Sequence, residues 1–291
     1  KDDEALICLD YAQLELRVGT LYHQDPVMMK VLCDPKGDLH QETADRFGVK
    51  RDPFAKNINF LLQFGGEAYA LAKFLNGLGL KISKTETQKW VDTYNYEVYV
   101  GVQPWRKELL SEHDENGFVS YFTGRKRRLL NGIPWQDAYL LHKAETTLAN
   151  NVVQGQGQDF LKAAIIRSDP KCINPDRAIL ARMTLPKAHR LYLQDNARRV
   201  DRIRAFLTKA DVRYLLQVHD EALWLTKLKY AEEALNMCAQ LMVMRHCFPP
   251  IKPYCVPLVA DGGVGHSWKE AKSKEAKIRL KYGFEEPIDD V

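Results

Sequence analysis

The sequence predicts an α+β fold, in which strands near the two ends of the chain flank a mostly helical middle. Residues 5–9 (ALICL) form a short uninterrupted apolar run, which is typical of a buried strand. Residues 213–226 are apolar on both sides of an acidic tip and predict a hairpin, and residues 256–259 begin a further strand region. Helical periodicity over residues 83–113 and 136–167 accounts for much of the chain between them.

The composition excludes several classes of protein. The chain has 291 residues, with 42 Lys and Arg against 38 Asp and Glu, and a net charge of +4. This surplus is too small for a histone-like binder that relies on bulk positive charge, but it is compatible with an enzyme that has a local basic groove. No apolar run approaches the roughly 18–20 residues that span a bilayer. We therefore expect a soluble protein that has no membrane partner. The six cysteines have no paired spacing, which predicts reduced thiols and a cytoplasmic protein.

A helix is predicted from Asp52, with proline in its first turn, to about Phe64, just before two glycines. At helical spacing, one face carries a cation, two amides and an aromatic ring: Lys56, Asn59, Phe60 and Gln63. Such a face suits a nucleotide, because lysine neutralises phosphate charge and base–aromatic stacking contributes roughly 1–3 kcal/mol. The alternative is an ordinary amphipathic helix with Phe60 packed into a core.

Three other segments have clear local signals. Ser83 and Glu86 form a capping box that starts a helical region. Residues 168–187 contain three prolines and predict a loop. The tail from Lys269 alternates Lys and Glu at helical spacing and predicts a solvated helix.

Two acids end predicted strands that lie far apart in the sequence. Asp10 follows the first strand, and Asp220 lies at the hairpin tip. Each alone is an ordinary turn residue, but together they suggest two carboxylates at one edge of a sheet. Such a pair can hold Mg²⁺ with water completing its shell. Two metals roughly 3.5–4 Å apart are the usual device for in-line phosphoryl displacement.

Several segments around these residues resemble the motifs of family A DNA polymerases, the group of bacterial DNA polymerase I. In chain order, the matching segments are residues 10–17 (DYAQLELR), 38–44 (DLHQETA), 56–60 (KNINF) with Phe64 and Gly65, 153–155 (VQG), 217–221 (QVHDE) and 256–268 (VPLVADGGVGHSW). The resemblance covers about residues 5–270.

The resemblance implies a nucleotide-binding and metal-binding set. Asp10 and Asp220 would bind two Mg²⁺ ions, with the backbone near Tyr11 helping. Further nucleotide contacts would come from Gln13, Glu15, His40, Arg51, Lys56, Phe60 and Phe64. Among these, Lys56 and His40 would contact the triphosphate. Glu15 would exclude a 2′-hydroxyl, because a carboxylate rejects a polar group that it cannot pair well; the alternative is a surface acid paired with Arg17 or a lysine.

The resemblance also implies contacts with DNA. Gln217 and His219, with the neighbouring Glu221, would lie at the primer terminus, and Asn150 and Gln154 on the template or primer side. For the basic cluster of Arg125, Arg127 and Arg128, contact with the nucleic-acid backbone and a solvated structural role remain open. A second basic set is expected to be a solvated helix face: Arg198, Arg199, Arg202 and Arg204.

The chain departs from the family pattern at several positions. The usual arginine one turn before the motif lysine is replaced by Asp52. Either Arg51 or Lys50 is the candidate substitute, or triphosphate binding is weaker. Phe64 replaces the family's usual tyrosine, and Leu61 replaces a usual glycine. Residues 168–205 resemble an insertion before the motif at residues 217–221. The family's thumb, which precedes the first motif, has no counterpart in this sequence, so we expect a thumb-bearing partner chain or a missing N-terminal segment.

Together these features predict a right-hand polymerase core with an antiparallel palm sheet and mostly helical fingers. Residues 1–12 and 157–291 would form the palm, and residues 13–156 the fingers. The expected activity is template-directed addition of deoxynucleoside triphosphates to a primer on template DNA. The alternatives are a single-subunit RNA polymerase, against which Glu15 and Gln217 argue, and a non-catalytic DNA-binding or accessory subunit.

Overall fold

The computed structural model describes residues 3–182, 187–244, 256–273, 276 and 278–283. The chain divides into two compact units, which we call unit 1 (residues 1–14 and 157–291) and unit 2 (residues 15–156). The predicted palm thus includes residues 183–186, 245–255 and 284–291, which lie outside the described part of the chain. Helices combined with antiparallel sheets confirm the α+β class.

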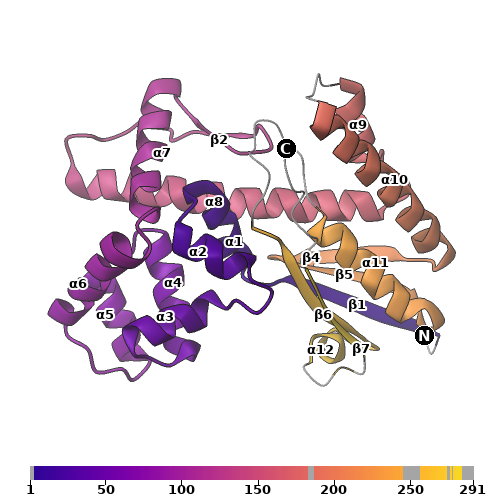
Figure 1. Cartoon of the computed structure of the whole chain (residues 1–291), viewed down its shortest axis with the longest axis horizontal. Helices are drawn as coiled ribbons and strands as arrows, with labels where there is room; N and C mark the ends of the chain where they lie inside the picture. Colours follow the sequence, from indigo (N-terminus) through magenta and orange to yellow (C-terminus); the bar gives the residue numbers. More distant parts are fainter. Residues whose placement is uncertain (1–2, 183–186, 245–255, 274–275, 277, 284–291) are drawn as a thin grey trace. The chain divides into compact units, whose positions relative to one another are not determined.

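Unit 1 is built on a five-stranded antiparallel sheet with the strand order β4-β5-β1-β6-β7 (Figure 1). Its strands are β1 (Glu4–Tyr11), β4 (Arg213–Val218), β5 (Glu221–Lys227), β6 (Val259–Gly265) and β7 (Ile278–Gly283). The strand predicted at residues 5–9 is the middle of β1, and the predicted hairpin is β4 with β5. Both predictions are confirmed.

The two faces of the central strand β1 differ in chemistry. Ile7 and Leu9 are fully buried, and Tyr11 on the same face donates from its hydroxyl to the Met242 carbonyl at 2.7 Å. Because side chains alternate along a strand, Cys8 and Asp10 point to the opposite face. There Cys8 forms a buried cluster with Leu223 and Ala271. The sheet therefore has one purely structural face and one that carries an acid.

Helices cover both faces of this sheet. They are the C-terminal part of α8 (Ala138–Ser168), α9 (Pro175–Arg182), α10 (Lys187–Lys209), the 3₁₀ turn η3 (Leu228–Tyr230), α11 (Ala231–Val243) and α12 (Trp268–Lys272). Met242 belongs to α11 and Ala271 to α12, so these two helices lie on opposite faces (Figure 1).

Two expectations for unit 1 were wrong. The predicted loop at residues 168–187 contains α9, which begins at Pro175, where proline suits the first helical position. A buried ion pair fixes this helix, because Arg167 contacts both carboxylate oxygens of Asp176 at 3.0 and 2.8 Å. The predicted tail helix ends at Lys272, and β7 then pairs with β6.

Unit 2 is mostly helical. Its helices are α1 (Leu14–His23, whose first residue belongs to unit 1), α2 (Pro26–Cys33), α3 (Leu39–Phe47), α4 (Lys56–Gln63), α5 (Ala68–Gly77), α6 (Lys84–Asp92), α7 (Val102–Asn116) and the N-terminal part of α8. Two π-helical segments, η1 (Arg51–Ala55) and η2 (Thr93–Val98), precede α4 and follow α6, and a small hairpin joins β2 (Val119–Ser120) to β3 (Lys126–Arg127).

Local signals in unit 2 were largely correct. The Ser83 and Glu86 capping box is present at the start of α6. The helix predicted from Asp52 begins later, at Lys56, because Asp52 has an extended backbone (φ −113°, ψ 132°). Its end is as predicted, since the Gly66 amide donates to the Leu61 carbonyl at 2.8 Å. No helix in the described ranges is both long and apolar enough to cross a membrane.

Candidate functional site

The structure brings Asp10 and Asp220 together in unit 1. Asp10 is the cross-strand partner of Glu221, and Asp220 immediately precedes Glu221 in the β4–β5 turn. The Tyr11 amide donates to the Asp220 carbonyl oxygen at 3.4 Å. Burial, followed by the negative charges of Asp220 and Glu221, raises the pKa of Asp10 from 3.8 to about 7, while Lys272 acts in the opposite direction.

This acid pair has the chemistry of a divalent-cation site. In the described part of the chain, Asp10 Oδ1 is buried and has no hydrogen-bond partner. Carboxylate oxygens are the ligands that Mg²⁺ prefers, and a cation would relieve the repulsion between the two acids. No group of three or more His, Cys, Asp or Glu suited to a metal occurs among the described residues, so the candidate rests on two acids. The phenol of Tyr11 lies on the other face, which leaves only its backbone near Asp220.

A third acid flanks Asp10 on the other side. Asp261 of β6 is the cross-strand partner of Asp10 and therefore lies on the same face of the sheet. The sequence analysis did not single it out. Lys281 of β7 is in turn the partner of Asp261, so this cross-strand row consists of three acids followed by one lysine.

The turn that carries Asp220 is held by amides. His219 is exposed and has a left-handed backbone (φ 56°). Its carbonyl oxygen accepts hydrogen bonds from Gln217 Nε2 and Gln158 Nε2, each at 2.9 Å, and Gln217 also donates to Gln158 Oε1. Two predicted primer-side residues, Gln217 and His219, are thus neighbours. Gln158 was missed, although it follows Gln154 by one helical turn.

Glu221, which the sequence placed at the DNA, has its carboxylate directed inward. It is 2% exposed. Trp268 Nε1 donates to one of its oxygens, and Lys272 Nζ lies 2.5 Å from the other. Both partners belong to α12 and were not predicted as site residues.

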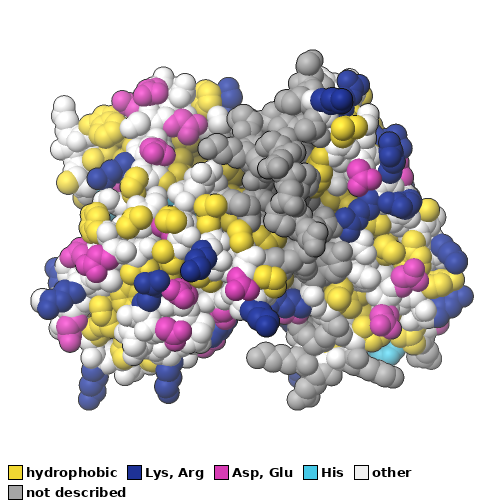
Figure 2. All heavy atoms as spheres, viewed as in Figure 1, with side chains coloured by type: hydrophobic (Ala, Val, Ile, Leu, Met, Phe, Trp, Pro, Cys, Tyr) yellow, Lys and Arg dark blue, Asp and Glu magenta, His cyan; other side chains and the backbone are white. Residues whose placement is uncertain are grey.

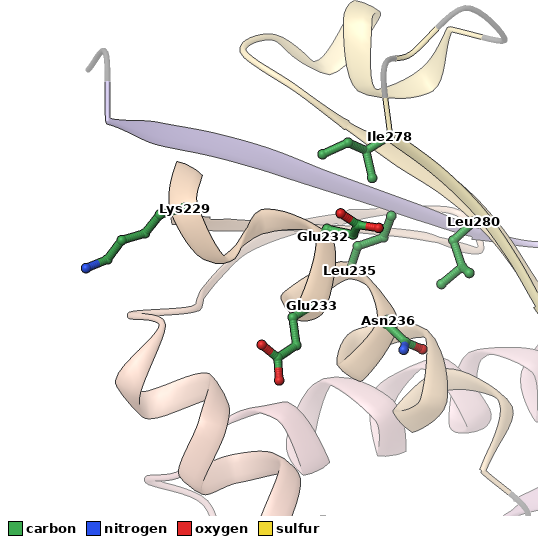
Figure 3. Close-up of a pocket in the computed structure, with 7 residues that line it drawn as sticks. All are labelled: Lys229, Glu232, Glu233, Leu235, Asn236, Ile278 and Leu280. Atoms are coloured by element: carbon green, nitrogen blue, oxygen red, sulfur yellow. The ribbon is translucent and has the colours of Figure 1, made fainter.

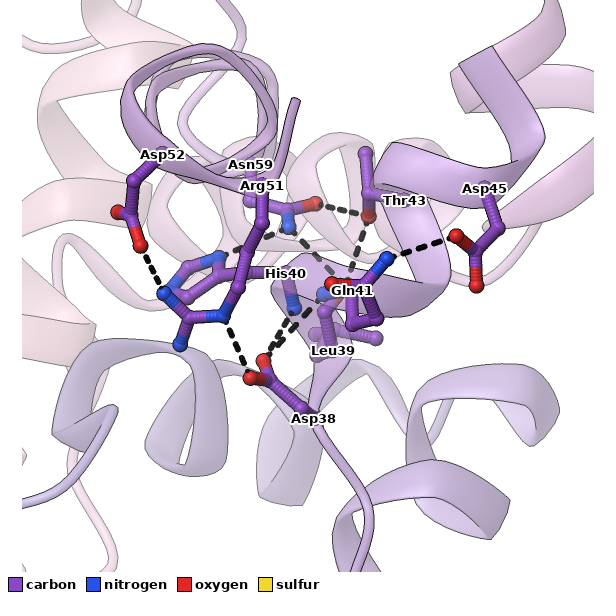
Figure 4. A network of polar contacts seen from close by, with 9 residues as sticks. All are labelled: Asp38, Leu39, His40, Gln41, Thr43, Asp45, Arg51, Asp52 and Asn59. Carbon is purple, nitrogen blue, oxygen red and sulfur yellow. Dashed lines mark hydrogen bonds and ion pairs between the residues drawn. The ribbon is translucent and has the colours of Figure 1, made fainter. Parts of the chain in front are cut away.

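In unit 2, a network of polar contacts joins α3 to η1 and α4 (Figure 4). His40 is buried, and Asn59 Nδ2 lies 3.1 Å from its Nδ1. Because an amide nitrogen donates, Nδ1 accepts and Nε2 carries the proton. Burial lowers the pKa of His40 to about 4. At neutral pH, His40 can therefore offer a phosphate one N–H donor but no positive charge.

Arg51 is engaged within the same network. Its guanidinium contacts Asp38 at 2.6 Å and also pairs with Asp52. Burial opposes ionisation of Asp38, but Arg51 outweighs it and lowers the pKa of that carboxyl. A phosphate would have to compete with these two carboxylates for Arg51. Lys56, at the first position of α4, is exposed.

The residues predicted to share one face of α4 differ in exposure. The two amides point inward: Asn59 and Gln63 are fully buried, and Gln63 Nε2 donates to the Glu15 carbonyl at 2.8 Å. Phe60 and Phe64 are half-buried. The ring of Phe60 lies 5.7 Å from the ring of His40, centroid to centroid. The inward amides anchor the helix and leave Lys56 and the phenylalanines as its accessible groups.

Glu15 has a partner other than those considered from the sequence. Gln154 Nε2 donates to Glu15 Oε1 at 3.1 Å, whereas Arg17 donates to the Leu32 carbonyl at 3.1 Å. Asn150 is half-buried one turn earlier in α8. Gln13 lies between β1 and α1 with a left-handed backbone (φ 55°).

The basic cluster after β2 is stacked on aromatic rings. Arg125 lies 4.5 Å above the Tyr121 ring and donates to the Gly155 carbonyl at 2.6 Å. Arg128 lies over the Phe118 ring. Arg127 is exposed in β3. All three remain exposed, so these contacts orient the cations without removing them from solvent.

The second basic set divides in two. Figure 2 shows Lys and Arg side chains along α10. Arg198 and Arg202 are exposed, as expected of a solvated face. Arg199 instead donates to Gln240 at 3.0 Å, and Arg204 donates to the carbonyls of residues 166, 167 and 172. These two arginines are structural.

A buried arginine that the sequence analysis missed supports α4. Arg106 of α7 donates to the Leu62 carbonyl at 2.8 Å and pairs with Glu145 of α8 at 3.0 Å. It therefore satisfies a carbonyl at the C-terminal end of α4, where helices leave such groups without a partner.

One pocket of unit 1 does not include Asp10 or Asp220. It has a volume of about 470 Å³ and is lined by Lys229, Glu232, Glu233, Leu235, Asn236, Ile278 and Leu280 (Figure 3). Ile278 and Leu280 of β7 pair with Val264 and Gly262, so they lie on the α11 face of the sheet, opposite Asp10. None of the predicted site residues lines this pocket.

Comparison with known proteins agrees with this arrangement of motifs. The model of DNA polymerase family A matches residues 1–270. The chain belongs to this family. Relatives include the thermostable DNA polymerase I of Thermus aquaticus (28% identical over 275 residues, 92% of this chain and 27% of that protein) and DNA polymerase I of Streptococcus pneumoniae (29% over 280 residues, 93% and 27%). The chain spans about a quarter of the length of these relatives.

A solved structure shows the same fold. The POL domain of Pol1 from M. smegmatis, in complex with DNA primer-template and dNTP, superposes with a TM-score of 0.65 at 24% identity, over 93% of this chain and 41% of that one. The likeness confirms the predicted fold of a polymerase core.

Proposed function

We propose that the chain is the palm and fingers part of a template-directed DNA polymerase. Unit 1 would be the palm, predicted at residues 1–12 and 157–291, and unit 2 the fingers, predicted at residues 13–156. The observation that carries the proposal is the acid pair: Asp10 and Asp220 adjoin, and a buried oxygen of Asp10 has no hydrogen-bond partner in the described part of the chain. Membership of family A supports it.

In this proposal, Asp10 and Asp220 hold two Mg²⁺ ions. When bound, the metal stabilises the negative charge that develops during phosphoryl transfer, which relies mainly on positioning and electrostatics. Lys56 neutralises triphosphate charge, and neutral His40 donates from Nε2 to a phosphate oxygen. Phe60 lies against the sugar and base, with Phe64 beside it on the same helix.

Specificity for deoxynucleotides would come from Glu15. Gln154 donates to its carboxylate, and Gln63 donates to its backbone carbonyl, so the side chain has a fixed place. A fixed carboxylate can exclude a 2′-hydroxyl that has no room to pair. This arrangement favours a DNA polymerase over the single-subunit RNA polymerase that shares the same acids.

The partners in this proposal are primer-template DNA and deoxynucleoside triphosphates. The related M. smegmatis domain was solved with both. Gln217, His219 and the exposed arginines at 125 and 127 are the proposed DNA contacts. A thumb would be supplied by a partner chain or by a further segment of the same polypeptide, because the relatives are about four times longer than the matched region.

Primer extension tests this function. The chain, alone and with a candidate thumb-bearing polypeptide, is given primer-template DNA, dNTPs and Mg²⁺. We expect metal-dependent extension that Asp220→Ala abolishes and that Asp211→Asn, an exposed acid in the preceding loop, leaves unchanged. Equal use of ribonucleotides would favour an RNA polymerase. DNA binding without extension under every condition would favour an accessory subunit.

A further inference from the structure

The carboxylate of Glu221 is fully occupied by helix α12. Glu221 lies directly across from Asp10 on the neighbouring strand, where Cβ atoms are roughly 4.5–5.5 Å apart. Trp268 Nε1 donates to Oε1, and Lys272 Nζ lies 2.5 Å from Oε2. Glu221 thus stands next to the acid pair, but both of its oxygens are directed to α12.

Helix α12 is fixed on the sheet by two glycines. A Cβ at Gly265 would lie 2.5 Å from the Ala271 amide nitrogen, and one at Gly263 would lie 2.8 Å from the Ala271 carbonyl oxygen. Both distances are shorter than real Cβ contacts, so only glycine lets the helix lie this close. Ser267 caps the helix by accepting from the Glu270 amide at 3.2 Å. The partners of Glu221 therefore have a defined position.

The pairing of Glu221 with Lys272 changes the charge next to the proposed cation site. Asp10, Asp220 and Glu221 adjoin, and Lys272 compensates the last of them. Asp10 Oδ1 has no hydrogen-bond partner in the described ranges, whereas both oxygens of Glu221 are paired. Glu221 is therefore a neighbour of Asp10, but its carboxylate is held by α12.

We propose that Trp268 and Lys272 are positioning residues, which hold Glu221 away from the cation and thereby keep its carboxylate out of the site formed by Asp10 and Asp220. This inference rests on the proposed function, because it takes Asp10 and Asp220 as the ligands. Its consequence is that α12 limits the affinity of the site for divalent ions.

Binding of Mn²⁺, followed by the EPR signal of the free ion, tests the inference on the whole chain. Lys272→Met removes a positive charge and releases the Glu221 carboxylate, so we expect Mn²⁺ to bind roughly tenfold more tightly, because affinity for a divalent ion rises with the negative charge of its site. Lys269→Met, which removes an exposed lysine of the same helix, is the matched control and should bind like wild type. Lys272→Arg keeps the ion pair and should also bind like wild type.

A double variant separates the role of Glu221 from general charge. Lys272→Met with Glu221→Gln should return to wild-type affinity, since the carboxylate that Lys272→Met releases is then absent. Equal affinities of Lys272→Met and Lys269→Met would overturn the inference. If Lys272→Met does not fold, Trp268→Phe provides the test: it should tighten binding by a smaller factor, and unchanged binding would overturn the inference.

Mn²⁺ binding by wild type and by Asp220→Asn distinguishes failure of the proposed function from failure of this inference. Should wild type bind no Mn²⁺, or Asp220→Asn bind it as wild type does, the two-acid site itself is wrong and the inference fails with it. Should Asp220→Asn abolish binding while Lys272→Met has no effect, only the role of α12 is wrong.

Discussion

Unit 1 and unit 2 treat charge in opposite ways. In unit 1, Asp10 and Asp220 adjoin as like charges, and the pKa of Asp10 rises to about 7. In unit 2, Arg51 is surrounded by the carboxylates of Asp38 and Asp52, and His40 is held neutral. The acid pair of unit 1 is a repulsive contact, whereas the charges in the unit 2 network are paired with opposite charges.

The difference separates residues that act on a ligand from residues that shape the unit. A like-charge pair weakens the fold unless a cation binds, so such pairs are typical of functional sites. A compensated network stabilises its own helices. Substitutions at Asp10 and Asp220 should therefore remove activity without loss of stability, and most substitutions in the unit 2 network should do the reverse.

The largest effect on stability is expected at Arg106 in unit 2. Arg106→Met leaves the half-buried Glu145 and the Leu62 carbonyl without their partner, which should cost about 3–5 kcal/mol of the free energy of unfolding. Urea denaturation measures it, with Lys107→Met, the exposed neighbour, as control. A loss below about 1 kcal/mol would show that this ion pair does not support α4.

Lys56 is the exception within unit 2, because it is exposed and the network does not use it. Lys56→Ala should lower kcat/KM for dNTPs by roughly 10–100-fold, the effect of losing one charge-assisted contact, and leave the melting temperature unchanged. Steady-state kinetics with the control Lys73→Ala, an exposed lysine of α5, test this. Equal kinetics for both variants would remove Lys56 from the site.

The pH dependence of stability probes the acid pair in unit 1. The folded protein holds a proton on Asp10 up to about pH 7, whereas an ordinary aspartate has lost it above 3.8. Metal-free wild type should therefore lose stability as pH rises through this range, and Asp10→Asn should not. In EDTA, the melting temperature of Asp10→Asn should exceed that of wild type at pH 8 by a few degrees, with a smaller difference at pH 5. A difference that stays constant with pH would contradict the raised pKa.

The smallest effect is expected at Arg51. Its ion pairs are partly exposed, so Arg51→Ala should cost less than about 1 kcal/mol of stability. It should also change kcat/KM for dNTPs far less than Lys56→Ala, because Asp38 and Asp52 compete for the guanidinium. Comparable losses in the two variants would mean that Arg51 leaves its carboxylates to bind the triphosphate.

The sequence was sufficient to predict the central strand, the hairpin and the meeting of Asp10 with Asp220. The ends of neighbouring strands in an antiparallel sheet lie close together. The motifs at residues 10–17 and 217–221 indicated that Asp10 and Asp220 are at such ends. It could not show which way α4 faces, since periodicity groups Asn59 with Lys56 but does not tell buried from exposed. The tail was predicted as a helix, although Ile278 and Leu280 alternate with basic residues as in a strand.

The supporting residues escaped prediction for a physical reason. Gln158, Trp268 and Lys272 act on groups 61, 47 and 51 residues away in the chain. The two contacts from α12 depend on how close that helix can lie to the sheet, which the glycines of β6 determine. No local pattern in the sequence carries that information.

The most direct test of the cation site is a crystal of this chain grown with Mn²⁺ and measured at the manganese absorption edge. An anomalous peak within ligand distance of the carboxylates of both Asp10 and Asp220 is the predicted result. A peak that contacts neither carboxylate, or no peak near them at saturating Mn²⁺, would contradict the account.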